Sequence, residues 1–292
     1  MINNNSPLVT VLVASYNHQN FVTECIKSIV NQTYKNIELI VIDDGSSDGS
    51  ISLIDELAKK HRFDFIHQKN EGLPAVLNKG LALAKGEFFV AIASDDMCFP
   101  DRIEKQVNDM RSHEDAGVCV GNCLIINEHG VPNKSQSVVK SRVLDFEDVF
   151  LRKRVRINAP TAMCRTDLLR EVGGYDPAIK IEDIYMWLKV TNNGSKIYVS
   201  SDVLAYYRKH DNNQSKDLNF MADGLEAIYA EYDWHPKYKE TLSKLQINLF
   251  AKSVKRNSKF SLSLFKRISP SQYTFKLLFM LFTWLVKAPF IR

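Results

Sequence analysis

The feature that most constrains the fold of this chain is an alternation of short apolar strands and amphipathic helices over roughly the first hundred residues. Residues 8–14 are β-rich and nearly all apolar, as in a strand buried on both faces, and they stop at a polar loop. Apolar residues then recur at helical spacing over 21–30. The same order continues with strands at 37–42, 63–67 and 88–93, and helices at 50–60 and 75–84.

This alternation predicts an α/β fold with a doubly wound, mostly parallel sheet, whose ligands bind at the carboxyl ends of the strands. Residues 117–203 contain strand-like runs at 118–126 and 197–205 and a helix at 184–190. We expect one catalytic domain over 1–218, divided into a nucleotide-sugar half (1–110) and an acceptor half (111–218). A helical C-terminal extension over 219–292 follows.

The overall charge conceals an asymmetry. The net charge is +4, yet ten Lys or Arg and no Asp or Glu follow Glu240. The five cysteines lack metal-ligand spacing, and the polar N-terminus lacks the basic start and apolar stretch of a signal peptide. We therefore expect a cytoplasmic protein with a basic C-terminal segment.

Acidic pairs stand where the carboxyl edge of the sheet is expected, at Asp43-Asp44 and Asp95-Asp96, with Glu182-Asp183 further along. Loop carboxylates are often solvated turn formers. Asp95-Asp96, however, directly follows the buried strand at 88–93, where two carboxylates would repel each other unless a cation bridged them. Mg²⁺ and Mn²⁺ bind carboxylates together with phosphate oxygens, so the pattern indicates a metal-bound diphosphate.

Two glycine-rich phosphate loops are absent from the sequence. No G-x-x-x-x-G-K-[ST] occurs, and no G-x-G-x-x-G follows the first strand. Their absence argues against a P-loop enzyme and a Rossmann dehydrogenase.

These motifs, in this order over about the first 215 residues, resemble the family 2 glycosyltransferases of the GT-A fold, of the bacterial polysaccharide and O-antigen type. Residues 11–17 resemble the opening strand and loop that contact the nucleotide, and residues 41–48 resemble the second nucleotide loop. The resemblance implies a UDP-sugar donor. Its binding residues would be Ala14, Tyr16 on the uracil ring, Asp44 on the uracil N3–H, Asp43 as support of the loop, and Asp95 on the ribose.

The resemblance also implies the metal and acceptor residues. Asp96 would bind Mn²⁺ or Mg²⁺, together with His210 from the loop that begins at Tyr207-Arg208-Lys209. Asp183 would be the general base of an inverting single displacement, with Glu182 and Trp187 on the acceptor side. For both acids the alternative is a role at a helix N-terminus, where the helix dipole stabilises negative charge. Tyr16 and Trp187 could equally be core aromatics.

The sequence departs from the family at Leu77, where an Arg commonly precedes Asn78. Two other functions are also compatible with the sequence. A nucleotidyltransferase also combines a nucleotide-binding α/β sheet with metal-binding acids, but it would release pyrophosphate. A non-catalytic, membrane-docked scaffold would retain only the transferase fold.

Basic and aromatic residues alternate in the C-terminal segment, where Lys252, Lys255, Arg256, Lys259, Lys266, Arg267, Lys276, Lys287 and Arg292 are interleaved with large apolar side chains. Basic amphipathic helices bind anionic membrane surfaces. We expect peripheral contact with the inner face of the cytoplasmic membrane and a glycan or lipid-linked oligosaccharide acceptor in surface polysaccharide biosynthesis. The alternative is a helix docked on the catalytic domain. The acidic remainder of the chain and the lack of a recognised motif predict no nucleic-acid binding.

Overall fold

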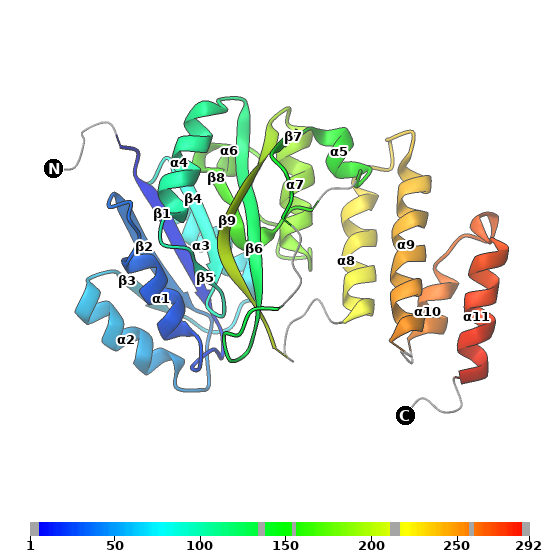
Figure 1. Ribbon diagram of the computed structural model, residues 1–292, viewed down its shortest axis with the longest axis horizontal. Coiled ribbons are helices and arrows are strands. Elements are labelled where there is room, and N and C mark those ends of the chain that lie inside the picture. Colours follow the sequence, from blue (N-terminus) through cyan, green and yellow to red (C-terminus); the bar gives the residue numbers. More distant parts are fainter. Residues whose placement is uncertain (1–5, 134–137, 154–155, 211–216, 257–259, 288–292) are drawn as a thin grey trace. The chain divides into compact units, whose positions relative to one another are not determined.

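The computed structural model of this protein describes residues 6–133, 138–153, 156–210, 217–256 and 260–287. The chain forms two compact units (Figure 1). The first unit comprises Met1–Pro177 and Tyr185–Asp211, and the second comprises Ala178–Ile184 and Asn212–Arg292. The catalytic-domain boundary expected at residue 218 stays a prediction. Lys259 and Arg292 of the predicted basic segment lie outside the described residues.

The described strands form one nine-stranded sheet in the first unit, with the order β3-β2-β1-β4-β8-β6-β9-β5 and with β7 paired to β9. The strands are β1 (Val9–Ser15), β2 (Ile37–Asp43), β3 (Asp64–His67), β4 (Phe88–Ala93), β5 (Met97–Cys98), β6 (Ala116–Asn127), β7 (Arg142–Leu144), β8 (Met163–Arg165) and β9 (Lys196–Lys209). The β3-β2-β1-β4 half is parallel throughout, and so is the long pair β6-β9. The short strands β5, β7 and β8 pair antiparallel.

Helices cover both faces of this sheet, as the sequence predicted (Figure 1). On one face, apolar side chains of β1, β2 and β4 pack against three amphipathic helices: α1 (Val22–Val30), α2 (Ser50–His61) and α4 (Arg102–Ser112). On the other face lie α3 (Leu73–Leu83) and α6 (Thr166–Glu171). Gly80 of α3 lies so close to Leu12 of β1 that a Cβ atom there would come within 2.4 Å of the leucine side chain. The mixed α/β fold is confirmed.

Helix α3 begins two residues earlier than expected. The sequence predicted a helix over 75–84, whereas the helix starts at Leu73. Proline is tolerated in the first turn of a helix because its missing N–H has no intrahelical partner there. The remaining helical elements of this unit are α5 (Phe146–Phe150) and η1 (Ala159–Thr161), and α7 (Glu182–Asn192) contributes its later turns.

The second unit is helical, as the sequence predicted. It contains the first turn of α7 and the elements α8 (Leu218–Ala230), α9 (Tyr238–Lys255), α10 (Ser261–Lys266), η3 (Pro270–Gln272) and α11 (Phe275–Lys287). Asp217 caps α8 by accepting from the backbone N–H groups of Asn219 and Phe220. None of the helices in the described part of the chain has both the length and the apolar character needed to cross a membrane.

Candidate active site at the carboxyl edge of the sheet

The carboxyl ends of β1, β2 and β4 bring the first predicted site residues together. In the sheet register, Ser15 at the end of β1 pairs with Asp43 at the end of β2, and Ala14 pairs with Ala93 at the end of β4. The backbone carbonyl of Ala14 accepts a hydrogen bond from the N–H of Ser94, 3.0 Å away. The three polar loops that follow these strands therefore start side by side.

Asp43 and Asp44 are buried and shape the loops around them. The Asp43 carboxylate accepts from the backbone N–H of Ser46 at 2.8 Å and from its hydroxyl at 2.6 Å, which closes the turn after β2. The role expected for Asp43 in the nucleotide site stays a prediction.

Asp44 links the loop after β2 to the loop after β3. Its Oδ1 accepts from Gln68 Nε2 and from the backbone N–H of Glu71, both at 2.9 Å, and its Oδ2 accepts from Gly72 N at 2.8 Å. A carboxylate offers about four acceptor positions, so these three bonds leave room for one further donor.

Gly45 permits the close approach of these two loops. Its φ of +80° belongs to the left-handed region, and a Cβ atom there would come within 2.8 Å of the backbone nitrogen of Asn70. Any larger residue would push apart the loop that Asp44 holds.

The structure distinguishes the two aromatic candidates. Tyr16 is 49% exposed and follows directly on β1, so its ring is available for stacking. Trp187 is only 6% exposed in α7, as a core aromatic would be. Its indole N–H has no hydrogen-bond partner among the described residues.

Three side chains of metal-ligating types converge at this edge of the sheet, and one of them, His18, follows Tyr16 by two residues. One ligand atom each of His18, Asp95 and His210 lies within 4.8 Å of the others. His210 Nε2 is 2.9 Å from Asp95 Oδ2, and His18 Nδ1 is 2.8 Å from Ser94 Oγ. Burial lowers the pKa of His18, with the charge of His210 adding to this and that of Asp95 opposing it, so the imidazole is held in the neutral form that binds metals.

The residues of this cluster suit a divalent transition ion. Two imidazoles and one carboxylate are ligands for Mn²⁺ and related ions, whereas Mg²⁺ prefers oxygen ligands alone. The family resemblance implied that Asp96 and His210 bind the metal and that Asp95 contacts the ribose. In the structure it is the Asp95 carboxylate that meets His210.

Asp96 points instead to the end of β9. Its Oδ1 accepts from the backbone N–H of Arg208 at 2.8 Å. Burial, followed by the charge of Asp95, raises the pKa of Asp96 well above its usual range, and the bond from Arg208 opposes this rise.

The buried Arg208 side chain connects three segments around the cluster. Nε donates to the backbone carbonyl of Asp95 at 2.9 Å, Nη1 to the carbonyl of Glu128 at 3.1 Å, and Nη2 to Glu24 Oε2 of α1 at 2.6 Å. The guanidinium also lies over the ring of Phe21. This residue places the loop after β4 against α1 and β9.

His18 was not among the metal ligands predicted from the sequence, because the predicted ligands at the strand ends were acids. The available signal was its position, four residues past the predicted first strand (8–14), in the same loop as Tyr16. Its proximity to Asp95 and His210 depends on pairing between distant strands. Because β5 pairs with β9 through Met97 and Cys98, the residues just before β5 face those that end β9.

Asn78 has a structural role at the position where the sequence departs from the family. Leu77 is buried in α3, and Asn78 both donates to the backbone carbonyl of Tyr175 at 2.7 Å and accepts from its N–H at 2.8 Å. The motif therefore ties α3 to the Gly173-Gly174-Tyr175 loop.

Glu182 and Asp183 occupy the first turn of α7, within the second unit. Both are half-buried. Burial, followed by the charge of Asp183, raises the pKa of Glu182 to about 7. Asp183 Oδ1 accepts from the N–H of Ile184 at 2.7 Å. The roles assigned to this pair from the sequence, a general base and an acceptor contact, stay predictions.

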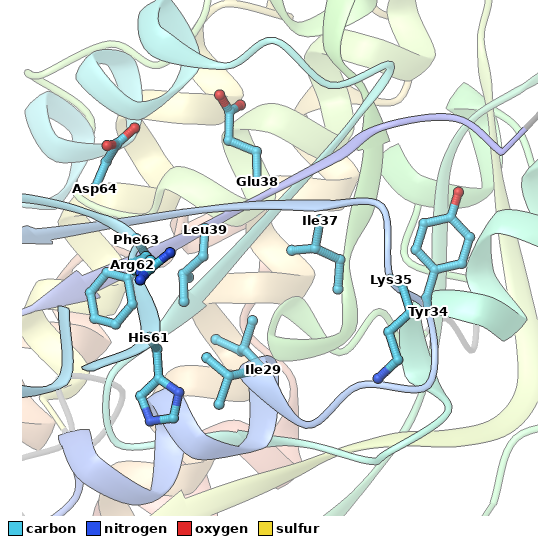
Figure 2. A pocket seen from close by; sticks show the side chains of 11 residues that line it. Ile29, Tyr34, Lys35, Ile37, Glu38, Leu39, His61, Arg62, Phe63 and Asp64 are labelled. Carbon is cyan, nitrogen blue, oxygen red and sulfur yellow. The ribbon is translucent and has the colours of Figure 1, made fainter. Parts of the chain in front are cut away.

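A cavity of about 310 Å³ lies at the opposite end of β2 (Figure 2). Ile37 and Leu39 of β2, Ile29 of α1 and Phe63 form its apolar part, and Arg62 lies among them. Asp43 lies six positions after Ile37 in β2, and six positions span about 20 Å along a strand. This cavity is therefore not part of the site at the carboxyl edge.

The chain matches known proteins over most of its length. Residues 10–171 match the family model described as glycosyl transferase family 2. Two relatives from Bacillus subtilis (strain 168) carry glycosyltransferase names. EpsH is 44% identical over 115 residues, which are 39% of this chain and 33% of EpsH. EpsE is 32% identical over 225 residues, which are 74% of this chain and 78% of EpsE.

Solved structures share the fold. The S. aureus TarS fragment 1–349 in complex with UDP-GlcNAc aligns with a TM-score of 0.66 at 19% identity, over 96% of this chain and 81% of that one. The mannosyltransferase PcManGT of Pyrobaculum calidifontis, in complex with GDP-Man and Mn²⁺, aligns with a TM-score of 0.60 at 19% identity, over 98% and 88%. These alignments show a shared fold, and the family match covers residues 10–171 of this chain. The chain belongs to family 2 of the glycosyltransferases, with a GT-A fold.

Proposed function

We propose that this protein is a metal-dependent, inverting glycosyltransferase that moves a sugar from a UDP-sugar to a hydroxyl group of a glycan acceptor. The observation that carries the proposal is the convergence of His18, Asp95 and His210 at the edge of the sheet where the exposed Tyr16 follows β1. A divalent cation and a nucleotide base would bind next to each other at this edge of the sheet.

Each residue has a role in this proposal. Tyr16 stacks on the uracil, and Asp44 accepts from the base with its remaining lone pair. His18, Asp95 and His210 hold the cation, and Asp96 supports them through Arg208. A bound divalent ion supplies the positive charge that a departing diphosphate needs.

On the acceptor side, we assign the general base to Asp183. A hydroxyl is a poor nucleophile near neutral pH, so a carboxylate within hydrogen-bond reach must take its proton as the new bond forms. Glu182 would contribute to acceptor binding. One base without a second nucleophilic carboxylate is the arrangement of a single displacement, which inverts the anomeric carbon.

The donor assignment draws support from the structural relatives. TarS is described with UDP-GlcNAc, and PcManGT with GDP-Man and Mn²⁺. Uridine is our choice because of Asp44 and Tyr16, and Mn²⁺ is our choice over Mg²⁺ because two of the three ligands are imidazoles. For the acceptor we propose a lipid-linked oligosaccharide at the inner face of the cytoplasmic membrane, in surface polysaccharide biosynthesis.

The test is a thermal-shift panel of the purified chain with UDP, GDP, CDP and ADP, each with Mn²⁺ and with a chelator. A ligand at a hundred times its Kd adds about 2.7 kcal/mol of stability, which corresponds to a rise of roughly 5 °C in Tm. We expect this rise for UDP with Mn²⁺ only, retained in the control His67→Ala and lost in His18→Ala and His210→Ala.

Product analysis separates this proposal from its alternatives. A glycosyltransferase incubated with a UDP-sugar and acceptor releases UDP, whereas a nucleotidyltransferase releases pyrophosphate. If no nucleoside diphosphate raises Tm under any condition, the donor site is refuted and the scaffold reading is favoured.

A further inference from the structure

The outer face of helix α11 carries six large apolar side chains that the structure leaves between 45% and 86% exposed. They recur every three to four residues and therefore lie on one side of the helix. They are Phe275, Leu278, Phe279, Phe282, Leu285 and Val286. Contiguous apolar patches of this kind are rare on monomeric proteins and commonly mark a contact surface.

The opposite face of α11 packs into the second unit. Leu277 and Trp284 are buried there, and the helix contacts α9 and α10. Helix α11 is therefore held in place by its inner face while its outer face stays apolar.

Exposed lysines are found on α11 and on the two helices that it contacts. Lys276 is exposed on α11, Lys252 and Lys255 on α9, and Lys266 on α10. No Asp or Glu follows Glu240 in the sequence. Arg267 is different, because it pairs with Asp223 at 2.7 Å and with Glu226 at 2.8 Å, which neutralises its charge within the unit.

We propose that the outer face of α11 inserts into the interface of an anionic lipid bilayer, with the helix lying parallel to the membrane. Its 13 residues span about 20 Å. Interfacial helices of this kind bury their apolar face roughly 5–10 Å deep, and neighbouring lysines bind anionic headgroups.

A second copy of this chain fits the face less well. A stable protein interface buries about 800 Å² per partner, more than the six side chains of one short helix supply. Lys276 lies on the same helix, so a symmetric contact would also bring two copies of its positive charge to one interface. A bilayer accepts a single helix face and attracts those charges.

This membrane contact rests on the proposed location at the inner face of the membrane and is independent of the donor chemistry.

The structure also divides the apolar residues of the C-terminal segment into two groups. Leu264, Phe265 and Trp284 are buried, so they support the fold and are not available to the membrane.

The experiment is co-sedimentation of the full chain with vesicles of phosphatidylglycerol and phosphatidylcholine, compared with vesicles of phosphatidylcholine alone. Phe279→Ser/Phe282→Ser removes two side chains of the outer face. Leu83→Ser/Val131→Ser is the matched control, since both residues are exposed apolar side chains of the first unit. We expect the first variant to bind anionic vesicles at least tenfold more weakly and the control to bind like the wild type.

Two further measurements make the outcome specific. A retained rise in Tm with UDP and Mn²⁺ shows that the first variant is folded, and failure of that rise in the wild type would count against the donor site only. Equal binding of the two double variants, or wild-type binding that is as strong on phosphatidylcholine alone, overturns the proposal. A wild-type dimer that Phe279→Ser/Phe282→Ser converts to a monomer overturns it in favour of self-association.

Discussion

Arg208 Nη2 lies 2.6 Å from Glu24 Oε2, and this ion pair connects the end of β9 to the first turn of α1. The two partners differ in environment: the Arg208 side chain is 2% exposed, whereas that of Glu24 is 57% exposed. Loss of one partner should therefore have a different consequence from loss of the other.

Arg208→Lys should destabilise the protein by about 3 kcal/mol, because an ammonium group cannot replace the buried fork that donates to Asp95, Glu128 and Glu24. Glu24→Gln should cost less than about 1 kcal/mol, since the Glu24 side chain is itself mostly solvated. Urea unfolding measures both. Equal losses for the two variants would contradict the role given to Arg208.

Asp44→Asn should lower the free energy of unfolding by about 1–3 kcal/mol. The amide NH₂ group of Asn would replace a carboxylate oxygen that now accepts hydrogen bonds, so two donors would face each other. UDP binding should also weaken. Asp64→Asn, at an exposed position, is the control. Calorimetric Tm values and UDP titrations provide the comparison, and unchanged values for Asp44→Asn would show that the loop does not depend on this carboxylate.

Tyr16→Ala should leave unfolding within about 0.5 kcal/mol of the wild type, since the ring is largely exposed. Loss of stacking should weaken UDP binding about tenfold or more. Trp187→Ala should instead lower the free energy of unfolding by about 3–5 kcal/mol, because the lost side chain leaves a cavity. Isothermal titration and urea unfolding test the pair, and UDP affinity unaffected by Tyr16→Ala would remove the ring from the donor site.

Asp183→Asn should reduce kcat by two or more decades while UDP binding stays nearly intact, because a base acts on the acceptor and not on the donor. Steady-state turnover of a UDP-sugar with acceptor, combined with UDP titration, separates the two effects. Turnover retained within a factor of about three would exclude Asp183 as the general base.

The raised pKa of Glu182 predicts that the stability of the protein depends on pH. Its pKa is raised to about 7 from an ordinary value near 4.5, so between these values the folded state binds more protons than the unfolded state. The free energy of unfolding should therefore fall as pH rises from about 5 to 7. Glu182→Gln should remove this fall and raise Tm at pH 8 relative to the wild type, with little difference at pH 5. Parallel slopes for the two proteins would contradict the raised pKa.

The fold could be predicted from the sequence because its signals are local. The apolar run of β1 and the helical spacing of apolar residues in α1 are each visible within about ten positions of the chain. Each pattern reflects whether one or two faces of the element are buried. The same holds for the polar residues that follow β1, β2 and β4, which the carboxyl edge of a parallel sheet gathers into one place.

The partners within the site depended on tertiary structure. Asp95 and His210 are 115 positions apart and meet only because β5 pairs with β9. Nothing in the local pattern of Ser94-Asp95-Asp96 indicates which acid faces His210 and which accepts from Arg208. His18 joins them because β1 pairs with β4, which brings the loop after β1 beside Ser94 and Asp95.

In the C-terminal segment, the sequence determined that helices would form and that they would be basic. Phe265 and Phe282 both occupy apolar positions of helical segments, yet one is buried and the other is 63% exposed. Periodicity identifies an apolar face, but only the packing of α9, α10 and α11 decides which face is covered. Burial is a property of the neighbours a face acquires, and those neighbours are distant in the chain.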